Sequence, residues 1–235
     1  MKVNELIKQL LFPLRCPVCD EPVRPFGHKI CPECLEKRKL LHAPYCMKCG
    51  KKLYDDNELC RDCSRNAHTF IRGRALYEYE SVVSSVYRFK YSGRQEYADF
   101  FGEEMAMYLG EFIQNIQPDA LIPVPLHRKR QNKRGYNQAA LLADALGWYT
   151  GVPVRHDVLF RTKNTTPLKY LNPKERQNNL KKAFNIGQND VKLKKVILVD
   201  DIYTTGSTMN EAASVLIKAG VKQVYFVALA CGEGV

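Results

Sequence analysis

The last third of the chain alternates short apolar runs with an amphipathic stretch. Val196–Val199 and Val224–Leu229 are continuous runs of apolar side chains, which are typical of parallel strands buried on both faces. Between them the pattern predicts a helix that begins near Thr208, which has Glu211 at capping-box spacing. These three elements form one βαβ unit, in which the first strand leads through a turn into the helix.

The same alternation begins at about residue 70. The stretch from Leu76 to Phe89 is strand-like at first and then carries apolar residues at helical spacing. The elements predicted after it are a helix at Tyr97–Phe112, a strand at Ala120–Pro125, a helix at Ala139–Leu146 that Gly147 ends, and a strand near Val154–Phe160. Strands that alternate with helices predict an α/β fold with a mostly parallel sheet and helices on both faces.

Three basic segments lie between these elements. Arg88–Arg94 is predicted to be a basic turn marked by glycine, His127–Arg134 has five basic residues in eight, and Arg161–Lys182 is also basic. Because ligands of parallel sheets bind at the carboxyl ends of the strands, we expect the last two segments to converge with the turn after Val199. The alternative for each is a charged loop that only faces solvent.

That turn carries the most informative chemistry in the chain. Two carboxylates, Asp200 and Asp201, end the apolar run, and small hydroxyl-rich residues follow: Thr204, Thr205, Gly206, Ser207 and Thr208. A helix N-terminus binds phosphate through its unpaired N–H groups, and the hydroxyls add donors. Carboxylates would repel a phosphate, so we expect them to face sugar hydroxyls or Mg²⁺. A sugar phosphate suits both halves, whereas an ordinary βα turn with a good N-cap needs neither the acid pair nor the hydroxyl run.

The first 65 residues have a different composition. Eight of the nine cysteines form four Cys-x-x-Cys pairs, Cys16/Cys19, Cys31/Cys34, Cys46/Cys49 and Cys60/Cys63. Two such pairs complete one tetrahedral Zn²⁺ site, so the sequence predicts two structural zinc ions. Pairing in sequence order is the simplest arrangement, and an interleaved one remains open. Disulfides do not suit a reducing compartment, and redox pairs need a βαβ context that is absent here.

The cysteine-rich segment predicts a small separate unit. We expect a double zinc ribbon at residues 1–65, whose folding depends on the metal, followed by the α/β domain at residues 70–235. A closed Cys₄ site has no open position for catalysis. His28, His42 and His68 are possible replacement ligands, but the four complete pairs make them unnecessary. Cys231 stands alone and is expected to be a buried or inert thiol.

Composition and charge indicate where the protein is located and what kinds of partner it binds. The 235 residues are 45% hydrophobic, yet no apolar stretch approaches the roughly 18–20 residues that cross a membrane. The start of the chain predicts a short amphipathic helix rather than a signal peptide, so we expect a cytoplasmic protein. The formal net charge is +11, and thiolates on zinc would reduce it without reversing it. A basic chain suits nucleic acids or phosphorylated substrates.

The stretch from Val199 to Thr208 resembles the phosphoribosyl pyrophosphate (PRPP) motif of type I phosphoribosyltransferases. The resemblance implies that the acid pair Asp200 and Asp201 is catalytic and contacts the ribose hydroxyls. It also implies that Thr204–Thr208 hold the 5′-phosphate and that Mg²⁺ accompanies PRPP.

The whole chain, about residues 12–230, resembles the ComF family. The motifs that carry this resemblance are the cysteine-rich segment, Arg88–Lys90, Pro123–His127, Arg134–Gln138, the string from Leu159 to Phe184 and the PRPP motif. In this family pattern, residues 123–134 take the place of the pyrophosphate loop, with Pro125, Leu126, His127, Arg128 and Arg134 as its site residues. Residues 162–180 take the place of the flexible loop, although Leu168 departs from the expected glutamine.

Two functions follow from the resemblance. The first is a ComF-type, PRPP-binding protein that handles single-stranded DNA during natural transformation, with a DNA-uptake helicase or processing protein as a possible partner. Aromatic and basic residues alternate from Tyr87 to Tyr91, a combination that suits stacked bases. The alternative is an active phosphoribosyltransferase that transfers phosphoribosyl from PRPP to a nucleobase or amine. No acceptor pocket is evident in the sequence.

Overall fold

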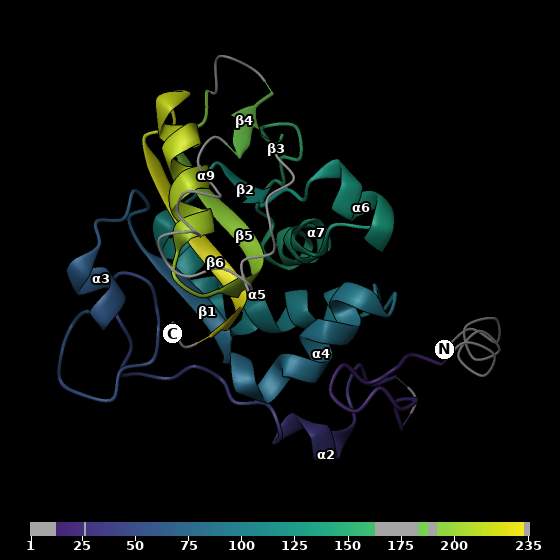
Figure 1. The fold of residues 1–235 in the computed structure, drawn as a ribbon. Coiled ribbons are helices and arrows are strands. Elements are labelled where there is room, and N and C mark those ends of the chain that lie inside the picture. The colour runs from purple at the N-terminus through teal and green to yellow at the C-terminus, as the bar shows by residue number, and fades with distance from the viewer. Residues whose placement is uncertain (1–12, 26, 163–182, 188–191, 233–235) are drawn as a thin grey trace.

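The computed structural model describes residues 13–25, 27–162, 183–187 and 192–232 (Figure 1). The predicted helix at the start of the chain and almost all of the predicted flexible loop lie outside these residues. In chain order the elements are α2 (Pro32–Leu35), α3 (Arg61–Arg65), β1 (Gly73–Glu78), α4 (Tyr79–Tyr91), α5 (Tyr97–Ile116), β2 (Ala120–Pro123), α6 (Arg128–Arg134), α7 (Gln138–Thr150), β3 (Leu159–Arg161), β4 (Phe184–Ile186), β5 (Lys195–Tyr203), α9 (Ser207–Lys218) and β6 (Gln223–Cys231).

The main sheet has four parallel strands in the order β1-β6-β5-β2. Its central strands β5 and β6 are the two apolar runs of the predicted βαβ unit, and both extend beyond those runs. Strands buried on both faces need apolar side chains at every position, which explains their continuous pattern. The predicted α/β fold with a parallel sheet is confirmed.

Helices cover both faces of this sheet, as predicted (Figure 1). Ile197 and Val199 of β5 belong to the hydrophobic cluster that includes α4, α5 and α7. Val196 and Leu198 point the other way, into the cluster that includes α9. This alternation follows from the period of two in a strand. No helix among the described residues is both long and apolar enough to span a membrane.

The cysteine-rich segment lies against the edge of the sheet. Leu40 forms an isolated antiparallel bridge with Tyr77 in β1, and the Gly73 N–H donates to the Lys48 carbonyl at 2.9 Å. These contacts cover a strand edge that would otherwise expose its backbone groups. Residues of both parts belong to the same hydrophobic clusters. The division into residues 1–65 and 70–235 therefore stays a prediction.

The two halves of this segment pack on opposite faces of the sheet. Cys16 and Cys34 belong to the cluster under α4 and α5, whereas Cys46 and Cys49 belong to the cluster on the α9 side. The segment therefore straddles β1.

The third predicted strand of the α/β domain is different in the structure. The strand predicted near Val154–Phe160 is only Leu159–Arg161, and it pairs antiparallel with β4 in a separate sheet. Val154 makes a single parallel bridge to Leu121. Such short pairings depend on residues distant in the chain, which local periodicity does not detect.

Helix α7 also runs past Gly147, the predicted end, to Thr150. Gly151, with a φ of +73°, takes the left-handed cap position instead. Gly147 has a packing role, because a Cβ there would lie 2.5 Å from Val154 Cγ2.

Candidate functional site

The predicted acid pair lies inside β5 rather than after it. The strand continues through Asp200 and Asp201 to Tyr203, paired with β6 along its length. The Asp201 N–H donates to Asp200 Oδ1 at 2.8 Å, and Asp201 Oδ1 lies 3.0 Å from Lys90 Nζ. The two carboxylates are therefore held near the carboxyl end of a central strand, where ligands of parallel sheets bind.

Positive groups from two elements, α4 and β3, act on this pair. Burial, and secondly the charge of Asp201, raises the pKa of the Asp200 carboxyl to about 7, while Lys90 and Arg161 oppose the rise. Burial lowers the pKa of the Arg161 guanidinium to about 10; the charge of Arg130 acts in the same direction and that of Asp200 against it. Thus α4 and β3 each place a cation close enough to affect the acid pair, and Arg130 of α6 acts on Arg161.

The hydroxyl-rich turn forms the N-terminus of α9. The helix begins at Ser207 with Gly206 as its N-cap. Thr208, which was predicted to be the cap, therefore lies inside the helix. Gly206 has a φ of +78° and no side chain to bond the first N–H groups of the helix. Thr205 Oγ1 and Ser207 Oγ are 3.0 Å apart, close enough to share a hydrogen bond. This geometry is suited to an anion such as phosphate.

Two aromatic side chains lie directly behind this turn. A Cβ on Gly206 would come 2.7 Å from Tyr203 Oη and 3.2 Å from His68 Cε1. Tyr203 is buried and stacks on Phe226 with ring centroids 4.6 Å apart. Burial also lowers the pKa of His68. This support for the turn comes from residues distant in the sequence, and its one local signal is the small residue required at position 206.

The predicted pyrophosphate segment starts beside the acid pair. Pro123 is in register with Val199, and the Val124 N–H donates to the Val199 carbonyl at 2.9 Å. Pro125, Leu126 and His127 follow, all of intermediate exposure. This segment was expected to converge with the turn after Val199 because both leave the carboxyl ends of strands, and its first residues do lie beside that end of β5.

Most of this segment is a helix and not the expected loop. Residues Arg128–Arg134 form α6, in which His127 Nδ1 accepts from the Lys129 N–H at 3.2 Å as the N-cap. Gly135, with a φ of +84°, caps its other end. Arg134 donates to Gln138 Oε1 at 2.7 Å and to Tyr91 Oη at 3.0 Å, so its guanidinium is directed toward α4.

The predicted basic turn at Arg88–Arg94 is helical as far as Tyr91. Its side chains diverge: Arg88 donates to the Val18 carbonyl at 2.5 Å, Phe89 is fully buried, and Lys90 pairs with Asp201. Lys90 is therefore a residue of the candidate site, although the sequence placed it in a basic turn, a family motif and a stretch suited to stacked bases, and not beside the acid pair. Nothing local to Lys90 indicates its distant partner.

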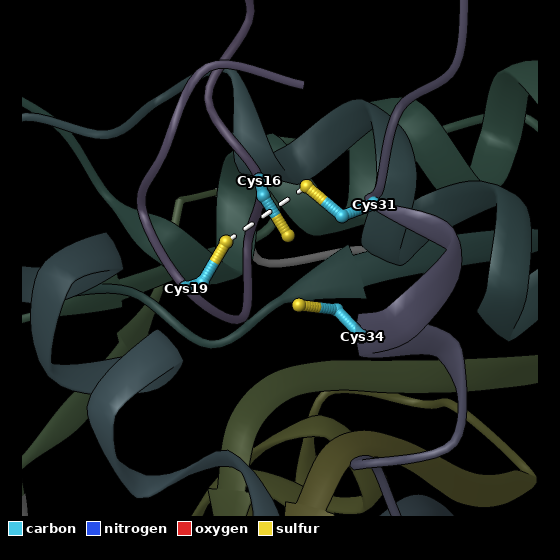
Figure 2. Close-up of side chains that lie close together, drawn as sticks. All are labelled: Cys16, Cys19, Cys31 and Cys34. Carbon is cyan, nitrogen blue, oxygen red and sulfur yellow. Dashed lines mark hydrogen bonds between the residues drawn. The ribbon is translucent and has the colours of Figure 1, made fainter. Parts of the chain in front are cut away.

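The eight paired cysteines form two clusters in sequence order. Within each cluster the four sulfur atoms lie within 4.8 Å of one another. Figure 2 shows the four side chains of the first cluster pointing toward a common centre. The clusters are Cys16, Cys19, Cys31 and Cys34, and Cys46, Cys49, Cys60 and Cys63. The structure thus selects the sequential pairing over the interleaved alternative.

The sulfur spacing fits zinc. The Cys19 and Cys31 sulfurs are 3.9 Å apart, and those of Cys49 and Cys60 are 3.7 Å apart. A tetrahedron with Zn–S bonds of about 2.3 Å has edges of about 3.8 Å. Four cysteines leave no position for substrate, so both sites are of the structural kind. Cys231 takes no part in either cluster and is buried, as predicted.

Comparison with known families agrees with both parts of the chain. A family described as "Double zinc ribbon domain" matches residues 7–64, and one described as "Phosphoribosyl transferase domain" matches residues 111–233. The two matches correspond to the segment that holds the cysteine clusters and to most of the parallel sheet.

Three relatives resemble nearly the whole chain. Competence protein F of Haemophilus influenzae is 31% identical over 219 residues, which cover 91% of this chain and 95% of that protein. Competence protein ComFC of Bacillus subtilis is 30% identical, covering 82% of this chain and 79% of its own. DNA utilization protein YhgH of Escherichia coli K12 is 28% identical, covering 92% and 96%.

Among solved structures, a purine phosphoribosyltransferase from Pyrococcus horikoshii overlaps with a TM-score of 0.33 at 19% identity, over 59% of this chain and 72% of that chain. So low a score adds nothing to the family assignment.

Proposed function

This chain belongs to the ComF family of competence proteins, and from that premise we propose that it handles single-stranded DNA during natural transformation and binds PRPP in its α/β domain. Two relatives are named for competence and a third for DNA utilization. The formal net charge of +11 favours a polyanionic partner. The proposed location is the cytoplasm, where thiols stay reduced, and a DNA-uptake helicase or processing protein is the proposed partner.

The observation that carries PRPP binding is the juxtaposition of an acid pair and a phosphate turn on one strand. Strand β5 holds Asp200 and Asp201 and leads within a few residues to the Gly206 cap of α9. The carboxylates are suited to the ribose hydroxyls, and residues Thr204–Thr208 are suited to the 5′-phosphate. A simple anion site would gain nothing from two nearby carboxylates, whereas a ribose phosphate uses both groups.

Pyrophosphate binding is assigned to the segment after β2. Pro125, Leu126, His127 and Arg128 start next to the end of β5, and Arg134 ends the same segment. Mg²⁺, when bound with PRPP, supplies positive charge that offsets the pyrophosphate, and carboxylates such as Asp200 and Asp201 are the oxygen ligands it prefers. The protein's own cations near the site, Lys90 and Arg161, contribute further positive charge.

Phosphoribosyl transfer is the second candidate function. The observation in its favour is that positive groups from α4 and β3 lie near the acid pair, where charge on a leaving pyrophosphate needs stabilisation. An acceptor site is required as well. The two candidate functions therefore differ in one measurable respect. An enzyme releases pyrophosphate from PRPP when its acceptor is present, whereas a protein that only binds PRPP does not.

Calorimetry and a pyrophosphate assay together test both functions. We expect PRPP with Mg²⁺ to bind the wild type and to lose affinity for Asp201→Asn, whereas Asp157→Asn, at an exposed position, binds normally. Absence of PRPP binding by the wild type would refute the proposal for the α/β domain. Pyrophosphate release that requires one nucleobase or amine and Asp201 would make the protein an enzyme.

Binding of labelled oligothymidylate tests the DNA function. We expect affinity to fall steeply between about 50 and about 200 mM salt, because released counterions drive such binding. Asp200→Asn should leave this binding in place, since the acid pair is assigned to PRPP. A wild-type protein that binds no single-stranded DNA at low salt would refute the DNA function.

A further inference from the structure

Helix α4 has an outer face that the PRPP site does not use. Its inner residues, such as Val82, Val86 and Phe89, are buried under the rest of the fold. Tyr87 and Tyr91 lie one turn apart on the opposite side and are 61% and 56% exposed. Large aromatic side chains with this exposure offer ring faces to a ligand.

The two tyrosine rings form a pair. Their centroids are 5.0 Å apart with an angle of 49° between the planes. Residues four positions apart on a helix are neighbours, so the helix places the two tyrosines side by side, and a hydrogen bond from Arg134 holds the Tyr91 ring. Rings already placed side by side lose less entropy when a flat ligand stacks on them.

Arg134 of α6 extends this pair. Its guanidinium carbon lies 4.8 Å from the centroid of the Tyr91 ring, and its Nη2 donates to Tyr91 Oη at 3.0 Å. A second hydrogen bond to Gln138 holds the group in place. Tyr87, Tyr91 and Arg134 together form an aromatic–cation ladder that joins α4 to α6, helices on the same side of the molecule in Figure 1.

The surroundings of the ladder are strongly positive. Five of the seven residues in α6 are Lys or Arg and none is acidic. Arg128, Lys129 and Lys133 are exposed there. A surface with planar rings beside a dense row of cations matches a ligand that has planar bases on a phosphate backbone, which is the chemistry of a single strand. An apolar protein segment would gain nothing from the cations.

We propose that the aromatic–cation ladder is a docking surface for single-stranded DNA, with bases stacked on Tyr87 and Tyr91 and the backbone along Lys129 and Lys133 of α6. Arg128 and Arg134 are then shared with the proposed pyrophosphate segment. This proposal rests on the proposed DNA function and assigns it to particular residues. A duplex keeps its bases stacked inside and cannot use the rings. The adjacent residue Lys90 contacts Asp201 from the same helix, so a strand on the ladder lies next to the acid pair.

Fluorescence anisotropy with labelled oligothymidylate tests the ladder. We expect Tyr91→Ala to weaken binding about 5- to 50-fold and the Tyr87→Ala, Tyr91→Ala double variant to weaken it further, since base stacking on aromatic residues contributes on this scale. Tyr91→Phe keeps the ring and should retain most of the affinity. Trp148→Ala, which removes an 83% exposed ring on α7, is the matched control and should bind like the wild type.

Salt dependence separates stacking from charge. Lys129→Gln should reduce the slope of log affinity against log salt by about 0.7, the value for one phosphate contact on a single strand, whereas Tyr91→Ala should leave the slope unchanged. An oligonucleotide with abasic sites should bind the wild type more weakly than intact oligothymidylate does. The double variant, which lacks both rings, should bind the two oligonucleotides equally well.

The outcomes distinguish this proposal from the function on which it rests. If the wild type binds oligothymidylate and the folded tyrosine variants bind it equally well, the ladder is not the DNA surface and a protein contact becomes its better assignment. If the wild type binds no single strand at all, the DNA function and the ladder proposal fail together. Circular dichroism melts confirm that each variant is folded.

Discussion

The ammonium of Lys90 lies 3.0 Å from Oδ1 of Asp201, and both side chains are largely buried, with 16% and 13% of their surfaces exposed. This ion pair fixes α4 to the carboxyl end of β5. One face of α4 is therefore held at the acid pair, while Tyr87 and Tyr91 face outward. The proposed PRPP and DNA sites share this helix.

Removing the Lys90 charge should destabilise the fold. Lys90→Gln leaves Asp201 partly buried without its cation, so we expect the free energy of unfolding to fall by about 1–3 kcal/mol. Urea denaturation measures the change. Arg155→Gln is the control, because its pair with Asp157 is exposed and should matter little. Equal losses of unfolding free energy for Lys90→Gln and Arg155→Gln would contradict a stabilising role for the buried Lys90–Asp201 pair.

Stability should depend on pH through Asp200. Its pKa is raised to about 7 by burial and then by Asp201, so the folded state holds the proton more tightly than the unfolded state. This stabilisation is present below pH 4 and is lost as pH rises toward 7. We expect Asp200→Asn to be more stable than the wild type by roughly 1–2 kcal/mol at pH 8 and nearly equal to it at about pH 4.

Urea denaturation of both proteins at the two pH values tests this. Asp201→Asn serves as the contrasting variant, because it removes the partner of Lys90 and should not stabilise the protein at pH 8. A gain for Asp200→Asn that is the same at both pH values would show that ionisation of this carboxyl is not its cause.

Gly206→Ala should damage the proposed phosphate turn. The backbone has a φ of +78° there, and the added Cβ would lie 2.7 Å from the hydroxyl of the buried Tyr203. We expect a loss of about 1–3 kcal/mol in unfolding free energy and at least about tenfold weaker PRPP binding, measured by calorimetry. Gly151→Ala has a similar φ but open space around it, so its PRPP affinity should be unchanged. Normal PRPP binding by Gly206→Ala would argue against this turn as the phosphate site.

Zinc content should be two ions per chain, and the clusters should respond differently to substitution. Cys49 is fully buried in the cluster on the α9 side, whereas Cys19 is exposed. We expect Cys49→Ser to lose one zinc and on the order of 3 kcal/mol or more of stability, and Cys19→Ser to cost less. Elemental analysis and thermal denaturation measure both. Equal losses of stability for the two variants would show that burial of the cysteine does not set how much each substitution destabilises the protein.

Some features followed from short stretches of sequence alone. The four Cys-x-x-Cys pairs indicated zinc because the spacing within each pair sets the distance between sulfurs through the covalent chain. The apolar runs of β5 and β6 indicated buried parallel strands because a strand covered on both faces needs apolar side chains at successive positions. Helix α6 had local signals too, namely the cap residues His127 and Gly135, but its dense charge favoured the wrong prediction of a loop.

The chain by itself thus determined the cysteine ligands of the metal clusters, the acid pair, the hydroxyl-rich turn and the fold class, because each depends on residues close together in the sequence. Tertiary structure alone decided that the cysteine pairs combine sequentially, that Lys90 meets Asp201, and that Tyr203 supports Gly206. It also turned Tyr91 toward Arg134. These relationships join segments far apart in the chain, so their distances are set by how helices pack on the sheet and not by any local pattern of residues.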